Sequence, residues 1–595
     1  MIESFLSRRT LLRATAAGTL GTAFLKKLPA AASFVDSYRT NIAANTTADT
    51  NAAVRILSGM QRLWQTGAAW NTGTVLDAPA LRASMRYVAH VSRTRTPAME
   101  ARAFVQDRQH QSYAAISGLG PLAPIYKAGA LAVTSITSAP AGTPATTIDD
   151  AVPAGAPAGS ALGAGSPTSA LGQVVSLVNT IRGSFSSGNP SKAAYQYPRP
   201  WRMNADSVVV DTGAVDALGF PVYDSPVTVV PQLLRQRSAT PSSDGGFPSG
   251  HTNAFHLAAL AFAYAVPERF QELVTAAFDL AETRIVSGMH SPVDVIGGRI
   301  LATALTAAIL NDPANLSLKT AAREQALAYF TAQVGDDVFG FAHRGADAYG
   351  DRKANANTIN PKLTYGLPRA RSNAAMVVPA GAEVLLETRQ PYLTAAQRRE
   401  VLRTTALGAG WTLLDGPESW GRLNLFAAAD GYGAFDRDVV VTLDAAAGGF
   451  GAADSWRNDI SGRGGLVKTG TGTLTLTGDN SYRGGTTIAG GTLVAASSRA
   501  LGCGDVVVSG GTLVVSRALR VAGSLRLGDL VVSRGAEIEV DGDAVLGGTL
   551  TVSRDGTVLS ARRVHGKFAR VVAPAGYRAT VGYTRTAVTV RLHRG

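Results

Sequence analysis

The sequence predicts a mainly α-helical domain followed by an all-β domain, because the spacing of apolar residues changes along the 595 residues. In the first part, apolar residues recur at helical spacing, as in 52–64 and 270–285. After about residue 440 the chain is rich in Gly, Thr and Val and shows the alternation of strands. A Gly-Thr-Leu tripeptide also recurs in this second part, which indicates repeated β structure.

Composition limits the class of protein before any motif is considered. One cysteine, Cys503, excludes a disulfide framework and a cysteine-based metal site. The longest apolar run, 257–266, is about half of what a transmembrane helix needs, so we expect no transmembrane segment. The formal charge of +13 is not gathered into basic runs with interleaved aromatic residues, so we expect no nucleic-acid partner.

Residues 1–32 have the features of a twin-arginine signal peptide. The pair Arg8-Arg9 precedes a modestly apolar stretch, 14–25, and small residues end at Ala32. The alternative is an amphipathic helix that stays on the protein. Cleavage after Ala32 would remove five basic residues and one acidic residue, lowering the charge from +13 to +9. We therefore expect a periplasmic or secreted protein.

Residues 33–440 are assigned to the helical domain. One helix is expected over 270–285, and the next begins at Pro292 and continues to about residue 310. Residues 138–171 are dominated by Ala, Pro, Gly, Ser and Thr, a composition that predicts a flexible loop. Residues 346–440 match no motif.

Residues 441–595 form the expected β domain. The Gly-Thr-Leu tripeptide begins at Gly472, Gly491, Gly511 and Gly548, with spacings of 19, 20 and 37 residues. The last spacing is close to two of the first, so the period is near twenty. This period, with glycine at the corners, predicts the rungs of a β-helix or solenoid, and a β-sandwich with chance recurrence is the alternative.

The stretch 464–487 resembles the passenger-associated repeat of bacterial autotransporters. It runs from Gly464 through Thr471-Gly472-Thr473-Leu474 to Asn480-Ser481-Tyr482 and ends at Thr487. About a hundred residues follow, fewer than the usual autotransporter translocator needs, so we do not expect self-export. The resemblance implies a contact with the cell envelope through the repeat domain.

Three segments far apart in the sequence carry residues suited to a phosphate site. The residues are Lys192 and Arg199, then Ser249, Gly250 and His251, then Arg284, His290 and Asp294. Two guanidinium groups and an ammonium group complement the oxygens of a tetrahedral dianion. The Ser-Gly turn opens an expected helix, where backbone N–H groups and the helix dipole favour an anion.

The two histidines supply reactive groups. Asp294 can accept a hydrogen bond from one ring nitrogen of His290 and leave the other nitrogen basic, which suits a nucleophile. A bound dianion favours the cationic form of His251, which suits a general acid, so activity should peak on the acid side of neutral. The alternatives are a helix-capping role for Asp294 with Ser291 and ordinary solvated charges for the basic residues. Three aromatic residues flank the motifs and either wall the leaving-group pocket or pack in the core: Tyr197, Trp201 and Phe247.

These segments resemble the signature of the type 2 phosphatidic acid phosphatase superfamily, which includes class A bacterial acid phosphatases and vanadium haloperoxidases. The match extends from Lys192 to Ala302, with Thr283 where serine is usual. The resemblance implies a helical bundle and an exported acid phosphatase that hydrolyses small phosphate monoesters. It further implies a phosphohistidine at His290, with Asp294 orienting it and His251 as the acid.

The resemblance implies no metal or other cofactor for a phosphatase. A vanadium-dependent haloperoxidase would bind vanadate with the same residues and is the first alternative. A surface or adhesion protein, with a β-helix as its working part and a vestigial catalytic domain, is the second.

Overall fold

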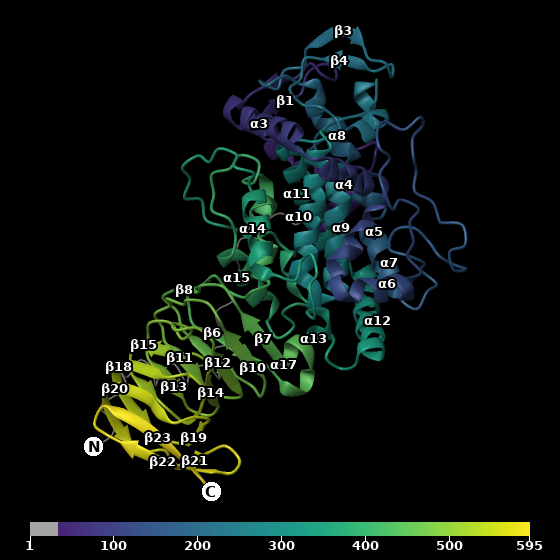
Figure 1. The fold of residues 1–595 in the computed structure, drawn as a ribbon. Coiled ribbons are helices and arrows are strands. Elements are labelled where there is room, and N and C mark those ends of the chain that lie inside the picture. The colour runs from purple at the N-terminus through teal and green to yellow at the C-terminus, as the bar shows by residue number, and fades with distance from the viewer. Residues whose placement is uncertain (1–33) are drawn as a thin grey trace.

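In a computed structural model, residues 34–595 are described, and they form a helical domain followed by a parallel β-solenoid (Figure 1). This arrangement confirms the predicted fold class. The expected signal peptide, residues 1–32, lies outside the described residues.

Three apolar helices occupy the centre of the helical domain: α9 (Gly250–Ala265), α10 (Phe270–Val286) and α11 (Pro292–Asn311). Helix α9 packs against both of the others, and almost every side chain of α11 is buried. Helices that are apolar on all sides belong to a core. Within residues 34–595, α11 alone has the length and hydropathy of a membrane span, and that window is entirely buried in the protein.

Further helices surround this centre, with short 3₁₀ turns between them. They are α2 (Ala52–Ile56), α3 (Ala78–Thr94), α4 (Pro97–Arg108), α5 (Gln111–Ala115), α6 (Ala123–Ala130), α7 (Gly172–Ile181), α8 (Asn189–Tyr195), α12 (Leu316–Val334), α13 (Val338–Ala342), α14 (Arg352–Lys362), α15 (Ala395–Thr404) and α16 (Leu425–Ala428). The one-turn helix α17 (Gly449–Ala452) lies instead beside β7 (Ala453–Trp456) of the solenoid. Short strand pairs β1–β2 (Trp64–Gln65, Thr74–Val75) and β3–β4 (Asp211–Val215, Pro221–Tyr223) lie among them.

Residues 138–171 contain no helix or strand, yet hydrogen bonds tie this loop to the helices. The Asp150 carboxylate accepts from the backbone N–H of His110 at 3.0 Å and from the hydroxyl of Thr134 at 2.8 Å. The Arg108 Nε donates to the carbonyl of Ile148 at 2.6 Å. The composition of the loop did not predict these attachments, because the partners lie elsewhere in the chain.

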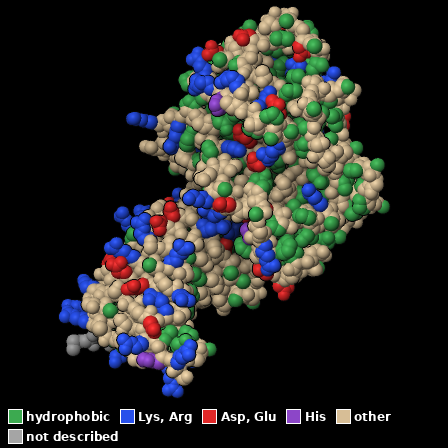
Figure 2. Space-filling model, in the orientation of Figure 1, with side chains coloured by type: hydrophobic (Ala, Val, Ile, Leu, Met, Phe, Trp, Pro, Cys, Tyr) green, Lys and Arg blue, Asp and Glu red, His purple; other side chains and the backbone are tan. Residues whose placement is uncertain are grey.

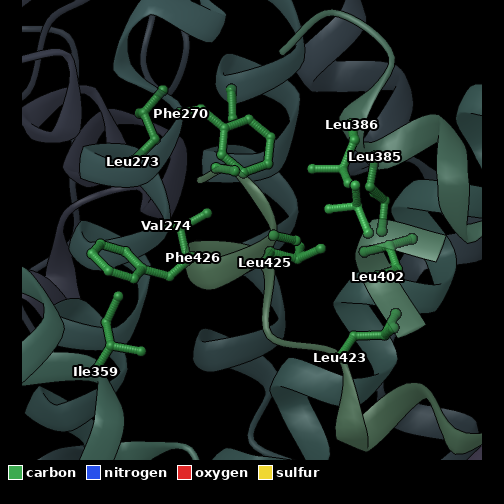
Figure 3. Close-up of a cluster of buried hydrophobic side chains, with 14 of the residues drawn as sticks. Phe270, Leu273, Val274, Ile359, Leu385, Leu386, Leu402, Leu423, Leu425 and Phe426 are labelled. Carbon is green, nitrogen blue, oxygen red and sulfur yellow. The ribbon is translucent and has the colours of Figure 1, made fainter. Parts of the chain in front are cut away.

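The stretch that matched no motif completes the core of the helical domain. Figure 3 shows Phe270, Leu273 and Val274 of α10 in one buried cluster with side chains from later segments. Those side chains are Ile359, Leu385, Leu386, Leu402, Leu423, Leu425 and Phe426.

The solenoid consists of two sheets. A seven-stranded sheet contains β7 (Ala453–Trp456), β10 (Thr473–Leu476), β12 (Thr492–Ala495), β14 (Thr512–Val515), β17 (Asp529–Val532), β19 (Thr549–Val552) and β21 (Arg570–Val572). A ten-stranded sheet contains β6 (Val439–Thr442), β9 (Leu466–Thr469), β11 (Thr486–Ile488), β13 (Val506–Val508), β15 (Leu519–Val521), β16 (Leu525–Arg526), β18 (Ile538–Leu546), β20 (Gly556–Gly566), β22 (Tyr577–Tyr583) and β23 (Ala587–Arg594). The strands pair in parallel except for the last hairpin, β22–β23, and its pairing with β20.

Each Gly-Thr-Leu tripeptide leads into a strand of the seven-stranded sheet. The leucines stack in register from one rung to the next and are fully buried: Leu474, Leu493, Leu513, Leu530 and Leu550. Leu530 follows Gly528-Asp529, so the 37-residue spacing contains one rung in which aspartate replaces threonine. A side chain on Gly491 would meet the Gly472 carbonyl at 2.4 Å, which explains glycine where rungs stack. The parallel rungs confirm the solenoid and exclude the β-sandwich.

The helical domain covers the first rung of the solenoid. The Arg389 guanidinium makes two hydrogen bonds, of 2.8 and 2.9 Å, to the carboxylate of Asp454 in β7. The hydroxyl of Tyr392 donates to the same carboxylate at 2.5 Å and accepts from Trp456 Nε1 at 2.8 Å. A small pair of strands, β5 (Ala434–Phe435) and β8 (Ser461–Gly462), bridges the two parts. The hydrophobic core is therefore continuous across the junction.

Candidate active site

The three predicted segments meet at one end of the central helices. Helices α9 and α11 begin here and α10 ends here. The backbone N–H of Ser249 donates to the carbonyl of Asp294 at 2.9 Å, which joins the start of α9 to the start of α11. The backbone N–H of His290 donates to the carbonyl of Arg284 at 3.1 Å and fixes the turn between α10 and α11. The predicted residues therefore lie in one cluster.

His290 is 1% exposed and lies between an arginine and a carboxylate. Its Nε2 is 2.6 Å from Arg199 Nη1, and its Nδ1 is 3.4 Å from Asp294 Oδ2. Since a guanidinium group only donates, Nε2 carries a lone pair and the ring proton is on Nδ1, toward Asp294. Burial, followed by the charges of Arg199 and Lys192, holds the pKa of His290 well below its usual range. The ring is therefore neutral and its Nε2 is basic.

Asp294 combines the two roles that the sequence left as alternatives. Its Oδ2 accepts from the backbone N–H of Ser291 at 2.8 Å and from the Ser291 hydroxyl at 3.2 Å, which caps α11. The same oxygen faces His290 Nδ1. Burial raises the pKa of Asp294 to about 7, and the Ser291 N–H opposes that rise.

Arg199 is held by an aspartate that the sequence did not reveal. Its Nε donates to Asp244 Oδ1 at 2.9 Å, and its Nη1 donates to the carbonyl of Met289 at 3.0 Å. The other oxygen of Asp244 accepts from Arg202 at 3.1 Å. Asp244 stands five residues before Ser249 with two glycines between, and this is a weak signal at most.

A second unpredicted carboxylate, Asp107 near the end of α4, contacts both Arg284 and His251. Arg284 Nη1 donates to Asp107 Oδ2, and His251 Nε2 lies 4.0 Å from that oxygen. Burial opposes ionisation of Asp107, but the Arg284 charge outweighs it, with help from Arg108 and from the Arg284 hydrogen bond, and the pKa of this carboxyl is lowered. No local pattern marks Asp107, because Arg284 and His251 lie more than a hundred residues away in sequence.

His251 is neutral when no phosphate is bound. The cationic ring expected from the sequence therefore depends on a bound dianion. Its Nε2 donates to the carbonyl of Asp107 at 3.1 Å. Burial and then the Arg284 charge lower the pKa of His251 to about 3, and Asp107 opposes them. A bound dianion must therefore offset burial and the arginine before this residue can act as an acid.

Lys192 and the start of α9 complete the site. Burial and then the Arg199 charge lower the pKa of Lys192, which lies on α8, to about 7. The Ser249 hydroxyl accepts from the backbone N–H of Thr252 at 3.3 Å, and the Ser249 N–H is already bonded to Asp294. Of the two predicted backbone donors, only that of Gly250, the first residue of α9, is free of a helical partner. A Cβ on Gly250 would contact nothing within 4 Å, so there is open space beside it.

The three flanking aromatic residues are buried in the core. Tyr197 and Phe247 are fully buried, edge-on to Trp64 at 5.2 Å and to Tyr195 at 5.6 Å. Trp201 is buried between Tyr223 and the Arg202 guanidinium. Their place beside the motifs could not separate these roles, because both positions favour large apolar rings.

No group of three or more His, Cys, Asp or Glu side chains within residues 34–595 is placed to hold a metal ion. The cluster described above is instead rich in cations, with Lys192, Arg199 and Arg284 around two histidines. Such a set favours an oxyanion as the ligand.

Comparison with known proteins finds two families along the chain. Residues 173–317 match the PAP2 superfamily, and residues 466–495 match the passenger-associated-transport-repeat. The chain is 38% identical to a non-specific acid phosphatase of Salmonella typhi over 71 residues, which is 12% of this chain and 28% of that protein.

Other relatives are autotransporters and extracellular proteins. The chain is 32% identical over 213 residues, 29% of its length, to an extracellular serine protease of Serratia marcescens. It is 33% identical over 216 residues, 31% of its length, to the Neisserial autotransporter lipoprotein NalP of Neisseria meningitidis serogroup B. These matches cover only 20% of the first protein and 19% of the second.

Proposed function

We propose that this chain, whose residues 173–317 form a PAP2 superfamily domain, is an acid phosphatase that hydrolyses small phosphate monoesters through a phosphohistidine. One observation carries the proposal. The unprotonated Nε2 of His290 lies 2.6 Å from Arg199 within a cluster of cations, while its Nδ1 faces Asp294. A neutral, oriented imidazole beside an anion-binding group is what nucleophilic attack on phosphorus requires. The similarity to a non-specific acid phosphatase supports the same reaction.

In the first step, the lone pair on His290 Nε2 attacks phosphorus and the bond from phosphorus to the ester oxygen breaks. His251, protonated in the complex, transfers its proton to the departing oxygen. Lys192, Arg199, Arg284 and the N–H of Gly250 bind the equatorial oxygens as negative charge builds on them. Asp294 stabilises the imidazolium form of His290 through Nδ1.

In the second step, water attacks the phosphohistidine. His251, now neutral, accepts a proton from this water, the bond from nitrogen to phosphorus breaks, and inorganic phosphate leaves. The low pKa of His251 favours release of its proton to the departing oxygen in the first step and leaves the ring neutral for the second.

The test is hydrolysis of p-nitrophenyl phosphate from acid to neutral pH by the full chain and by His290→Ala. We expect turnover by the wild type and a loss of about 10³-fold or more in the variant, whose fold is checked by circular dichroism. Turnover that survives His290→Ala overturns the mechanism. Bromide oxidation that depends on vanadate, with no phosphatase activity, would select the haloperoxidase.

We also propose that the protein is exported through its N-terminal segment and contacts the cell envelope through the solenoid. The extracellular and autotransporter relatives support this location. Residues 556–595 contain eight Lys and Arg residues and no Asp or Glu. Arg578 and Arg591 are exposed on the last hairpin. In Figure 2, Lys and Arg side chains lie along the solenoid with Asp and Glu side chains among them.

A basic surface of this kind fits the anionic headgroups of an envelope lipid. The full chain should cosediment with phosphatidylglycerol vesicles at low salt and should bind phosphatidylcholine vesicles much less. Arg578→Glu combined with Arg591→Glu should weaken that binding. Equal binding to both kinds of vesicle would refute the envelope contact.

A further inference from the structure

Trp70 is an aromatic side chain beside the phosphate site that no sequence motif includes. It lies on the loop between β1 and β2 and is partly exposed. A methyl group placed on Gly245 would lie 2.9 Å from Cζ3 of Trp70 and 3.4 Å from Cβ of Lys192. The indole ring, the bare backbone of Gly245 and the base of Lys192 therefore meet at one place.

The loop that carries Trp70 is attached to the helix that carries Lys192. The indole Nε1 of Trp64 donates to the carbonyl of Tyr195, the last residue of α8, at 3.2 Å. The hydroxyl of Thr66 donates to the same carbonyl at 3.1 Å. These bonds attach the start of the Trp70 loop to the helix that carries Lys192.

The position of Trp70 differs from that of the other aromatic side chains around the site. Trp64, Tyr197 and Phe247 are buried in the core, whereas Trp70 is partly exposed. Gly245 is the reason that the ring can come so close, because any Cβ there would collide with it. A partly exposed flat ring near the base of Lys192 is suited to stack on a ring of the ester group.

We propose that Trp70 is a specificity-determining residue that binds the leaving group, and that the preferred substrates are phosphomonoesters with a planar ring next to the ester oxygen. Such esters include aryl phosphates. The proposal rests on the phosphatase function proposed above and adds the substrate class. Stacking of this kind favours an aromatic ester over an aliphatic one by about three- to tenfold.

The test compares kcat/KM for p-nitrophenyl phosphate with kcat/KM for glycerol 2-phosphate in the full chain. We expect the ratio to fall by about three- to tenfold in Trp70→Ala and to be largely retained in Trp70→Phe. Gly245→Ala should lower the ratio as well, because its methyl group displaces the ring while the tryptophan stays present. Leu76→Ala is the matched control, since Leu76 follows β2 in the same hairpin and is 52% exposed.

Equal losses for both esters in Trp70→Ala, or an unchanged ratio, would overturn the proposal and leave Trp70 as a support for α8. A second measurement does not depend on turnover. Phenylphosphonate should bind more tightly than methylphosphonate to the wild type, and this preference should shrink in Trp70→Ala. A chain that hydrolyses neither ester but keeps the preference for phenylphosphonate would refute the phosphatase and retain the aromatic subsite. A chain that lacks the preference refutes the subsite.

Discussion

The helical domain and the solenoid differ in the charged side chains that they bury. The helical domain buries arginines and gives each of them acceptors, as at Arg202, Arg269, Arg284 and Arg389. In the described part of the solenoid, residues 441–595, the buried charged side chains are Asp454, Lys468 and Asp543. Buried charge destabilises a fold unless it is paired. Arg202 and Arg284 are paired at the candidate site, and Arg269 and Arg389 are paired elsewhere in the domain. The comparison therefore separates a part specialised for chemistry from a part stabilised by repetition.

Arg199→Ala should produce the largest effect among these predictions and tests the chemical side of the comparison. It removes the donor to His290 Nε2 and the partner of Asp244. We expect kcat for p-nitrophenyl phosphate to fall by about 10²–10³-fold, as for the loss of one transition-state donor. Arg578→Ala on the solenoid is the control and should leave kcat unchanged. A loss below tenfold in Arg199→Ala would show that this cation is not part of the phosphate site.

Asp107→Asn should lower kcat/KM by about 10–10²-fold, because Arg284 loses the carboxylate that positions it. The pH profile distinguishes this role from simple support of the fold. Asp107 favours the protonated form of His251, so its removal lowers the pKa of His251 further. Since the reaction needs protonated His251 in the complex, the alkaline limb of kcat should move to lower pH. A reduced rate with an unmoved limb would assign Asp107 a structural role alone.

Leu513→Ala tests the other side of the comparison. Leu513 is fully buried in the leucine ladder between Leu493 and Leu530. We expect the free energy of unfolding to drop by about 2–5 kcal/mol, measured by chemical denaturation, while kcat of the folded protein is unchanged. A fall in kcat that accompanies full folding would show that the solenoid acts on the active site through the shared core.

Lys192→Arg should have the smallest effect. The pKa of Lys192 is about 7, so its ammonium group is charged below that pH and loses its proton as the pH rises through it. Binding of sulfate, whose charge is constant in this range, should therefore weaken by about tenfold across neutrality in the wild type. The variant keeps its charge and should show a flatter profile. Identical profiles for the two proteins would mean that Lys192 does not bind the anion.

The sequence predicted the solenoid well because its repeat is local. The spacing of the Gly-Thr-Leu tripeptides corresponds to successive rungs. The 37-residue spacing spans two rungs, and Gly528-Asp529-Leu530 forms the one between. The period of the repeat sets the register, and the register sets which leucines are buried.

The sequence predicted the candidate site only in part. The eight motif residues are brought together, since their spacing reflects the ends of α8 to α11. Asp107 and Trp70 could not be predicted, because their roles depend on contacts with segments more than a hundred residues away. The neutral state of His251 could not be predicted either, because burial and the Arg284 charge arise only in the folded protein.

The most direct test of the central claim is to trap the covalent intermediate. The full chain is mixed with p-nitrophenyl phosphate at acid pH, quenched in alkali, which preserves phosphohistidine, and digested for mass spectrometry. We predict a phosphoryl group on the peptide that contains His290 in the wild type, and none on the corresponding peptide of His290→Ala. A phosphoryl group on any other residue, or turnover by the wild type with no trapped phosphohistidine under rapid quench, would contradict the account.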